Sequence, residues 1–339
     1  MRPSIGLALL LLSALHGGPR QEPPPVASVA FPPPFEAWLA DVRKEALARG
    51  IRPEIVEMAL DDVQPVARIL ERDRSQVEFE LDLDAYLTRR ITRETVRTAT
   101  RMRTQHRALL ARVGKVYGVQ PRFIVAIWGL ESNFGRFAGV RPTIPTLATL
   151  AYDTRRGTLF RRELFNALEI LDRGEIEIGG LKGSWAGALG QPQFMPSSYL
   201  KFAQDFDGDG KRDIWTSQAD VFASIAFFLK QHGWTDGQLW GREVRVPEGA
   251  RERLDALPRR TEGCRAARLL TEPRPLADWR ELGLKTAAGA PLPSGTFGAA
   301  FFSAGSRHYL AYRNYEALLG YNCAHSYALS IALLADRLR

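Results

Sequence analysis

Residues 121–135 read PRFIVAIWGLESNFG, and they are the most informative stretch of the chain. Pro121 suits the first turn of a helix, where its missing N–H costs nothing, and Gly135 suits the position where a helix stops. Nearly every residue between them is apolar. A helix that is apolar on all sides lies inside a protein core. We therefore expect a buried core helix with Glu131 at its inner, C-terminal end.

Glu131 in this position is expected to keep its proton near neutral pH. Burial disfavours the charged carboxylate, and the negative end of the helix dipole disfavours it again, so both raise its pKa. A carboxylic acid that is protonated near neutrality can donate a proton to a leaving oxygen, as glycosidic bond cleavage requires. The alternative is a glutamate that turns into solvent where the helix ends.

The chain before this helix divides into three regions. Arg2 and the apolar residues 5–15, too few to span a bilayer comfortably, are typical of an export signal over residues 1–16. The Pro-rich residues 17–34 form an extended linker that cannot pack a core. Residues 35–118 have apolar positions at helical spacing, which predicts an all-α N-terminal lobe. We expect a periplasmic location, with an uncleaved signal as a membrane tether as the alternative.

The chain after residue 118 alternates between helical and strand-rich composition. Residues 119–234 are again helical and form the expected catalytic core. Residues 235–300 contain an alternating segment, 239–246, and frequent Pro and Gly, which predicts a small lobe of strands and loops. Residues 301–339 are expected to return to the core, as helix from about His325.

The basic residues form a stripe. The net charge of +8 arises from 46 Lys and Arg against 38 Asp and Glu. Much of the excess lies in residues 89–112, which we read as one helix bearing Arg89, Arg90, Arg93, Arg97, Arg101, Arg103, Arg107 and Arg112. Nucleic acid is the usual partner of such a stripe, but an exported protein meets anionic envelope polymers and lipid headgroups instead. The expected explanation is a solvated helix face, with no nucleic-acid partner.

The chain has two cysteines, Cys264 and Cys323. In an oxidising compartment such a pair can close a disulfide, which would tie the late segment to the C-terminal helix. The alternative is two buried free thiols.

Several motifs occur in an order that resembles the membrane-bound lytic murein transglycosylase B family. They are VAIWGLESNFG at 125–135, TLATLAYD at 146–153, LKGSWAGALGQPQFMPSSY at 181–199 and DFDGDGKRDIW at 205–215. The resemblance runs from about residue 35 to residue 339, and several long motifs in order are more specific than one short pattern. It implies a mainly α protein with a lysozyme-like α+β core around a glycan cleft, acting on peptidoglycan strands as a monomer.

The resemblance also implies a reaction. Glu131 would protonate the oxygen between N-acetylmuramic acid and N-acetylglucosamine, then accept the proton of the muramoyl C6 hydroxyl as it attacks C1, leaving a 1,6-anhydro end. One carboxylate is enough because the nucleophile belongs to the substrate and is already close. A hydrolytic muramidase would need a second carboxylate, for which Asp153 is the candidate. The sequence also leaves open a non-catalytic peptidoglycan-binding protein and a calcium-responsive interaction module.

By the same resemblance, short neutral side chains and aromatic rings line the cleft. The expected residues are Ser184, Gln193, Phe194, Tyr86, Tyr321, Asn322 and Tyr327. A single aromatic residue, taken alone, is more often part of a core. The chain departs from the family at Phe227-Phe228, where the family often has Asn-Tyr. A tyrosine hydroxyl expected near the reacting sugar is therefore missing here.

The acidic loop 205–220 matches the first half of an EF-hand calcium loop, with aspartates at positions one, three and five and Gly210 at the sharp turn. Position twelve is Thr216 instead of a bidentate glutamate. In the resembling family the loop is longer and ends in an aspartate. The expected ligands are Asp205, Asp207, Asp209, Lys211 through its carbonyl and Asp220, with Asp213 through water. We expect a structural calcium ion and no catalytic cofactor, with a solvated Asp-Gly turn as the alternative.

Overall fold

The computed structural model describes residues 34–75, 82–295 and 297–338. The expected export signal and nearly all of the Pro-rich linker lie outside this part of the chain. The described residues form mainly helices, with one two-stranded and one five-stranded sheet. The prediction of a mainly α protein with a small strand-containing lobe is confirmed.

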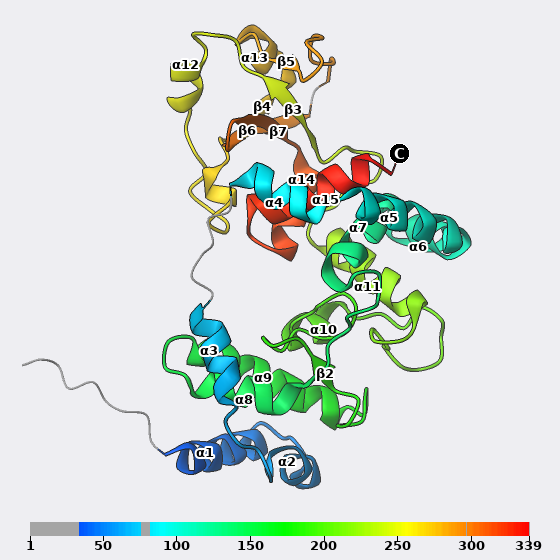
Figure 1. Ribbon diagram of the computed structural model, residues 1–339, viewed down its shortest axis with the longest axis vertical. Helices are drawn as coiled ribbons and strands as arrows, with labels where there is room; N and C mark the ends of the chain where they lie inside the picture. The colour runs from blue at the N-terminus through cyan, green and yellow to red at the C-terminus, as the bar shows by residue number, and fades with distance from the viewer. Residues whose placement is uncertain (1–33, 76–81, 296, 339) are drawn as a thin grey trace, which may run out of the picture.

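The helices and strands follow one another as in Figure 1. The helices are α1 (Phe35–Ala48), α2 (Pro53–Leu60), α3 (Ala67–Ser75), α4 (Leu83–Arg90), α5 (Arg93–Gln105), α6 (Arg107–Tyr117), α7 (Pro121–Ser132), α8 (Thr143–Tyr152), α9 (Gly157–Asp172), α10 (Pro196–Phe202), α11 (Gln218–Gln231), α12 (Arg251–Asp255), the 3-10 helix η1 (Ala267–Leu269), α13 (Leu276–Glu281), α14 (Arg313–Tyr321) and α15 (His325–Asp336). The strands are β1 (Arg141–Pro142), β2 (Lys182–Gly183), β3 (Gly241–Arg245), β4 (Arg274–Pro275), β5 (Lys285–Thr286), β6 (Gly298–Ala304) and β7 (Arg307–Ala311).

Helix α7 lies at the centre of the main core, as its apolar sequence predicts. Every residue from Phe123 to Leu130 is buried, and α5, α6, α11 and α15 pack against it. The helix ends at Ser132, three residues before the expected stop. Asn133 and Phe134 then adopt left-handed backbone conformations, with φ of 49° and 59°, which side-chain-bearing residues rarely do. This turn places the Phe134 ring against Gly129, where a Cβ would lie 2.5 Å from the ring.

The described elements of the N-terminal region are all helices, and they pack in two places. Helices α1 to α3 contact α8 and α9, whereas α4 to α6 contact α7, α11 and α15. In Figure 1 the first group lies at the bottom of the molecule and the second lies higher, beside α7 and α15. The first three helices and the next three therefore pack against different parts of the main core.

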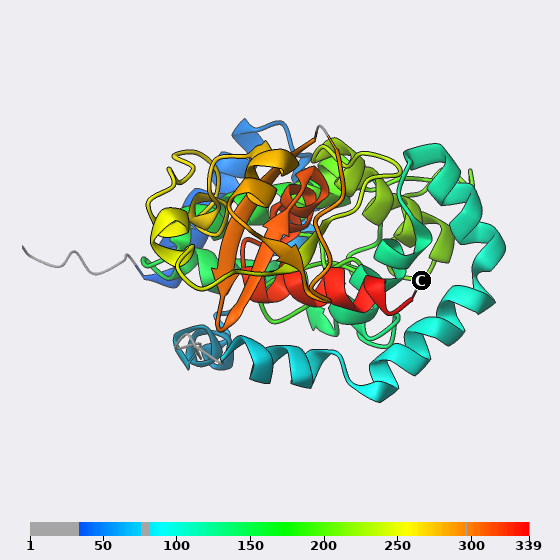
Figure 2. The same ribbon diagram turned by 90° about the horizontal axis from the view of Figure 1, so that it is seen from above.

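The basic segment 89–112 is not one helix. It is divided among α4, α5 and α6, which Figure 2 shows as a bent run along the outer edge. The break between α4 and α5 has a local cause. The Thr92 side chain caps α5 by accepting the Thr95 N–H at 3.0 Å. The expectation of a single helix is therefore wrong.

The small lobe has a core of its own, built around Trp279, Phe301 and Leu310. Its sheet has the strand order β4-β6-β7-β3-β5, and every pair is antiparallel. The expected lobe boundary at residue 300 falls inside β6, so that boundary needs correction. The lobe extends through β7, because the β6–β7 hairpin supplies the middle of the sheet, and α14 and α15 then return to the main core.

No single helix among the described residues is long and apolar enough to cross a membrane. The pair α14 and α15 meets the criteria of length and composition only when taken together, and the two are bent by 119°. Most residues of both helices are buried within the protein.

Candidate active site

Glu131 is placed by the last turn of α7, where two other helices reach it. Its side chain is mostly buried and keeps some exposure to solvent. The hydroxyl of Tyr327, from α15, donates a hydrogen bond to Glu131 Oε1. Arg90, from α4, donates from Nη2 to the Leu130 carbonyl at 3.0 Å. The sequence thus brings together one acid, one phenol and one guanidinium from helices far apart along the chain.

The environment of Glu131 raises its pKa from the ordinary value of 4.5 to about 7. Burial is the main cause, since it penalises the charged carboxylate. The Tyr327 hydrogen bond and the positive charge of Arg90 both favour the carboxylate and partly offset burial. At pH 7 the group is therefore divided between its acid and base forms, which suits a residue that first gives and then takes a proton.

An aromatic cluster extends from Tyr327. The Tyr321 ring lies parallel to that of Tyr327, with centroids 6.3 Å apart, and its hydroxyl donates to the Pro192 carbonyl at 2.7 Å. Phe228 contacts Tyr321 at 4.6 Å. Phe194 lies next to both rings, but it is only 2% exposed. Most of the Phe194 ring is therefore packed in the core, and the rest of it lines the groove described next.

A groove of about 260 Å³ begins beside this cluster. Its lining includes the predicted residues Gln193, Phe194 and Tyr321, together with Phe228 and His232. The Phe228 ring stacks on His232 at 4.0 Å. Ser197, Ser198 and Lys201 line it as well, so the groove combines ring faces with polar side chains, a composition suited to sugars.

The two predicted polar residues hold the shape of the loop between β2 and α10. The Ser184 Oγ accepts the N–H groups of Ala186 and Ala188, at 3.3 and 3.1 Å. Gln193 has a left-handed backbone, with φ of 55°, and its Nε2 donates to the Gly190 carbonyl at 2.7 Å. Both side chains keep partial exposure, so each can still offer a polar atom to a ligand.

The two remaining predicted cleft residues, Tyr86 and Asn322, do not line the groove. The Tyr86 ring lies 5.9 Å from the guanidinium carbon of Arg90, so it adjoins the group whose charge acts on Glu131. Asn322 follows Tyr321 directly and is exposed.

The acidic loop brings three carboxylates together. Oxygen atoms of Asp205, Asp207 and Asp209 all lie within 4.8 Å of one another, and the three residues are exposed. Asp220, in α11, is buried and accepts the N–H groups of Phe206 and Asp213 at 2.7 and 2.8 Å. It therefore fastens both ends of the loop to the helix. Several carboxylate oxygens in a small space are the ligand set that calcium prefers, so the residues fit this metal.

A family model described as the transglycosylase SLT domain matches residues 34–336. The chain belongs to this family. Membrane-bound lytic murein transglycosylase B of Escherichia coli (strain K12) is 39% identical over 153 residues, which is 45% of this chain and 42% of that protein. The match thus spans less than half the length of this curated relative.

Two solved structures of similar proteins extend the comparison. SltB3 from Pseudomonas aeruginosa, in complex with NAG-anhNAM-pentapeptide, has a TM-score of 0.82 and 40% identity, covering 90% of this chain and 79% of that one. Escherichia coli Slt35 in complex with calcium has a TM-score of 0.72 and 25% identity, covering 88% and 92%. The lysozyme-like fold and the family resemblance inferred from the motifs are confirmed.

Two residues of this transglycosylase SLT domain do not stand out as site residues in the sequence. Arg90 looks there like one more member of the basic stripe. Gln191 is buried, accepts the Trp128 indole N–H at 2.6 Å and donates to the Trp215 carbonyl at 2.7 Å. A Cβ on Gly135 would lie 2.6 Å from the Gln191 Oε1. The only sequence signal for Gln191 is its place in the same GQPQ motif as Gln193.

Proposed function

We propose that the protein is a lytic transglycosylase that cleaves the bond between N-acetylmuramic acid and N-acetylglucosamine in peptidoglycan, with Glu131 as its acid and base. The observation that carries the proposal is a carboxyl group with a pKa of about 7, hydrogen-bonded to Tyr327, whose ring stacks on Tyr321 in the wall of the aromatic groove. Family membership supports it, as does the peptidoglycan fragment bound to the SltB3 relative.

The reaction needs one proton to be moved twice. Protonated Glu131 donates its proton to the glycosidic oxygen while the bond to C1 breaks. The carboxylate then removes the proton of the muramoyl C6 hydroxyl as that oxygen attacks C1, which forms the 1,6-anhydro ring and restores the acid. Tyr327 and Arg90 lower the energy of the carboxylate between these two steps, since both favour the charged form.

A hydrolytic muramidase is the competing function. It would use a second carboxylate, such as Asp153, to activate water or to attack the sugar. Burial, Tyr327 and Arg90 are the influences that set the pKa of Glu131, and no carboxylate of the described residues is among them. We propose that Ser184, Gln193, Tyr321 and Asn322 bind the glycan.

We further propose that a structural calcium ion binds the acidic loop, through the carboxylates of Asp205, Asp207, Asp209 and Asp220 and the carbonyl of Lys211. The close carboxylates and the calcium bound to the Slt35 relative support it. The ion would hold the loop against α11 and take no part in proton transfer. Because peptidoglycan lies outside the cytoplasm, we also propose that the protein is exported and works there as a monomer.

Digestion of purified sacculi tests the reaction. Wild type should release fragments with anhydro ends, one water lighter than fragments with reducing ends, as measured by mass spectrometry. Glu131→Gln should release none, because an amide cannot donate the proton. Glu57→Gln, which removes an exposed carboxylate on α2, serves as the control and should behave as wild type. Reducing ends from wild type would indicate hydrolysis, and loss of them in Asp153→Asn would identify the second carboxylate.

A further inference from the structure

Helices α14 and α15 meet at a sharp bend beside the candidate site. The two helices are bent by 119° to one another, and residues 322–324 connect them. We call these three residues the corner. Tyr321, the last residue of α14, lines the groove and donates to the Pro192 carbonyl. Tyr327, in the first turn of α15, donates to Glu131. The corner therefore connects a groove residue to the residue that contacts the acid.

Little within the two helices holds the corner in place. Asn322 and Ala324 have extended backbones, with φ of −149° and −142°. No side chain of the described residues caps the start of α15, because Ala324 stands where serine, threonine, aspartate or asparagine is usually found. The corner therefore depends on contacts with another part of the protein.

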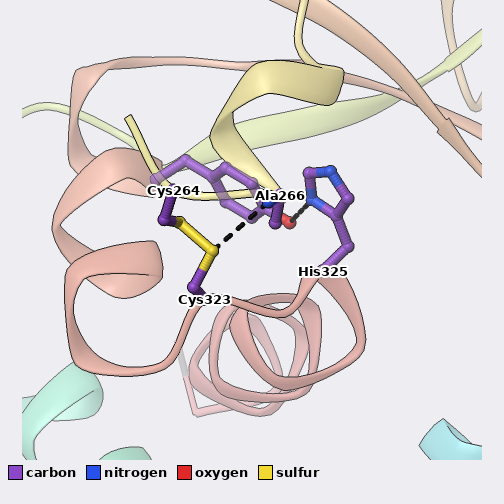
Figure 3. The surroundings of a disulfide bond; sticks show 5 residues. Cys264, Ala266, Cys323 and His325 are labelled. Atoms are coloured by element: carbon purple, nitrogen blue, oxygen red, sulfur yellow. Dashed lines mark hydrogen bonds between the residues drawn. A yellow bond between two sulfur atoms is a disulfide. The ribbon is translucent and has the colours of Figure 1, made fainter. Parts of the chain in front are cut away.

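The small lobe supplies such contacts through residues 264–266. Cys264 forms a disulfide with Cys323 of the corner, and their Cα atoms are 6.1 Å apart. Figure 3 shows Ala266 between this disulfide and His325. The Ala266 N–H donates to the Cys323 Sγ at 3.2 Å, and its carbonyl faces the His325 ring. The disulfide is the covalent part of this attachment.

Helix α15 also has contacts that do not depend on the disulfide. The His325 ring stacks on Phe302 at 4.3 Å and shares a hydrogen bond of 3.0 Å with the Tyr315 hydroxyl. Farther along, α15 packs against α7 and α4, and Tyr327 is buried. Loss of the disulfide should therefore affect the corner and Tyr321, while Tyr327 stays in place.

A reductant can reach the disulfide from solvent. Both cysteines are exposed, and both line a hollow of about 730 Å³ formed by α14 and residues 260–273. A thiolate of a small dithiol can attack one sulfur there and form a mixed disulfide, which its second thiol then resolves. The protein gains two thiols, and the dithiol, which loses two electrons and two protons, becomes a cyclic disulfide. The covalent attachment of the corner is therefore reversible.

We propose that the Cys264–Cys323 disulfide positions Tyr321 and Asn322 for glycan binding, and that its reduction weakens this binding without altering proton transfer at Glu131. This inference rests on the proposed function, in which Tyr321 and Asn322 bind the glycan. The disulfide acts through these neighbours, since Tyr321 and Asn322 directly precede Cys323 in the chain. Reduction by a dithiol lowers the affinity for the glycan, and reoxidation restores it.

The test measures cleavage of soluble, peptide-free glycan strands by oxidised wild type, by wild type reduced with dithiothreitol and by Cys264→Ser with Cys323→Ser. The reduced protein and the serine variant should have a KM about threefold to tenfold higher, as expected when one or two hydrogen bonds to the glycan are weakened. Their kcat and pH–rate profile should match those of oxidised wild type. Dithiothreitol should not change the serine variant. An unchanged KM after complete reduction, verified by thiol titration, would overturn the proposal.

A matched control separates positioning from a loss of stability. Leu254→Ala removes a fully buried side chain from the core of the small lobe, and it should destabilise the protein about as much as opening the disulfide. Leu254 lies outside residues 264–266 and outside the corner, so its variant should keep the KM of oxidised wild type. A similar rise of KM in Leu254→Ala would attribute the effect to stability and would refute the positioning.

Glycan binding by the inactive Glu131→Gln protein separates this proposal from the proposed function. Titration calorimetry with the same strands should show that reduction weakens binding by the factor found for KM. If wild type released no anhydro fragments but reduction still weakened binding, the reaction would be refuted and the positioning supported. If wild type cleaved the strands with the same KM in both redox states, the positioning would fail while the reaction stood.

Discussion

Replacing Glu131 with glutamine is expected to make the folded protein more stable at neutral and alkaline pH. The fold raises the pKa of Glu131 from 4.5 to about 7. Ionising this group therefore costs more in the folded than in the unfolded protein. At about 1.36 kcal/mol for each tenfold change in the ionisation equilibrium, the difference is about 3 kcal/mol. Glutamine has nearly the same shape, can still accept the Tyr327 hydrogen bond and never ionises.

The sign and the pH window follow from proton binding. Between pH 4.5 and about 7 the folded protein holds the Glu131 proton while the unfolded chain releases it, so wild-type stability falls as the pH rises. Below this window both states are protonated and the penalty is absent. Above it the penalty is complete. The stability difference between Glu131→Gln and wild type should therefore be small at about pH 4 and level off near about 3 kcal/mol above about pH 7.

Urea titrations of wild type and variant from about pH 4 to about pH 8, followed by tryptophan fluorescence, measure this difference. Glu57→Gln corrects for the loss of one negative charge, because Glu57 is exposed on α2. A stability difference that did not change with pH would refute the reasoning. It would mean that the Glu131 carboxyl ionises in the fold as readily as in the unfolded chain.

Three further predictions concern other parts of the molecule. Tyr327→Phe removes a hydrogen bond that lowers the pKa of Glu131, so the alkaline limb of the pH–rate profile should move up by about one to two pH units. The control is Tyr309→Phe, in which this limb should not move, because the buried Tyr309 hydroxyl has no hydrogen-bond partner among the described residues. Replacing Cys264 and Cys323 with serine opens a bond across 59 residues and should lower the free energy of unfolding by about 2 to 4 kcal/mol in denaturant titrations. Calcium at a hundredfold excess over its Kd should stabilise the protein by about 2.7 kcal/mol; a melting temperature that responded to neither calcium nor chelator would refute the metal site.

The fold could be predicted from the sequence where the signals are local. The burial of α7 follows from its composition, and its start at Pro121 follows from the preference of proline for the first helical turn. The predicted end of the helix is three residues too late. Asn133 and Phe134 leave the helix with left-handed backbones, and the turn packs the Phe134 ring against Gly129, a contact that the residue types alone do not reveal.

The errors in element boundaries have similar causes. The Thr92 cap that separates α4 from α5 is a local signal that the periodic arginines obscure. The lobe boundary predicted at residue 300 is misplaced because β6 pairs with β7 and β4. Strand pairing of this kind cannot be read from the composition of either strand alone.

Some residues of the candidate site can be predicted from the sequence, and others cannot. Glu131 can be found from burial at the end of a helix, whereas Tyr327, 196 residues later, depends on the family resemblance. The role of Arg90 is hidden because a guanidinium in a basic stripe looks like a solvated charge. Phe194 is predicted in the cleft from the family resemblance, and the sequence does not show how little of its ring is exposed where it lines the groove.

The pairing of Glu131 with Tyr327 bears on when a newly made chain gains its activity. The acid is synthesised 196 residues before the phenol that orients it, and the small lobe lies between the two. A chain that has emerged only as far as that lobe holds the glutamate without its partner, and its core lacks the helix that packs against α7. In such a growing chain Glu131 lacks the burial and the hydrogen bond that set its pKa, so these properties of the site arise only after α15 has been made.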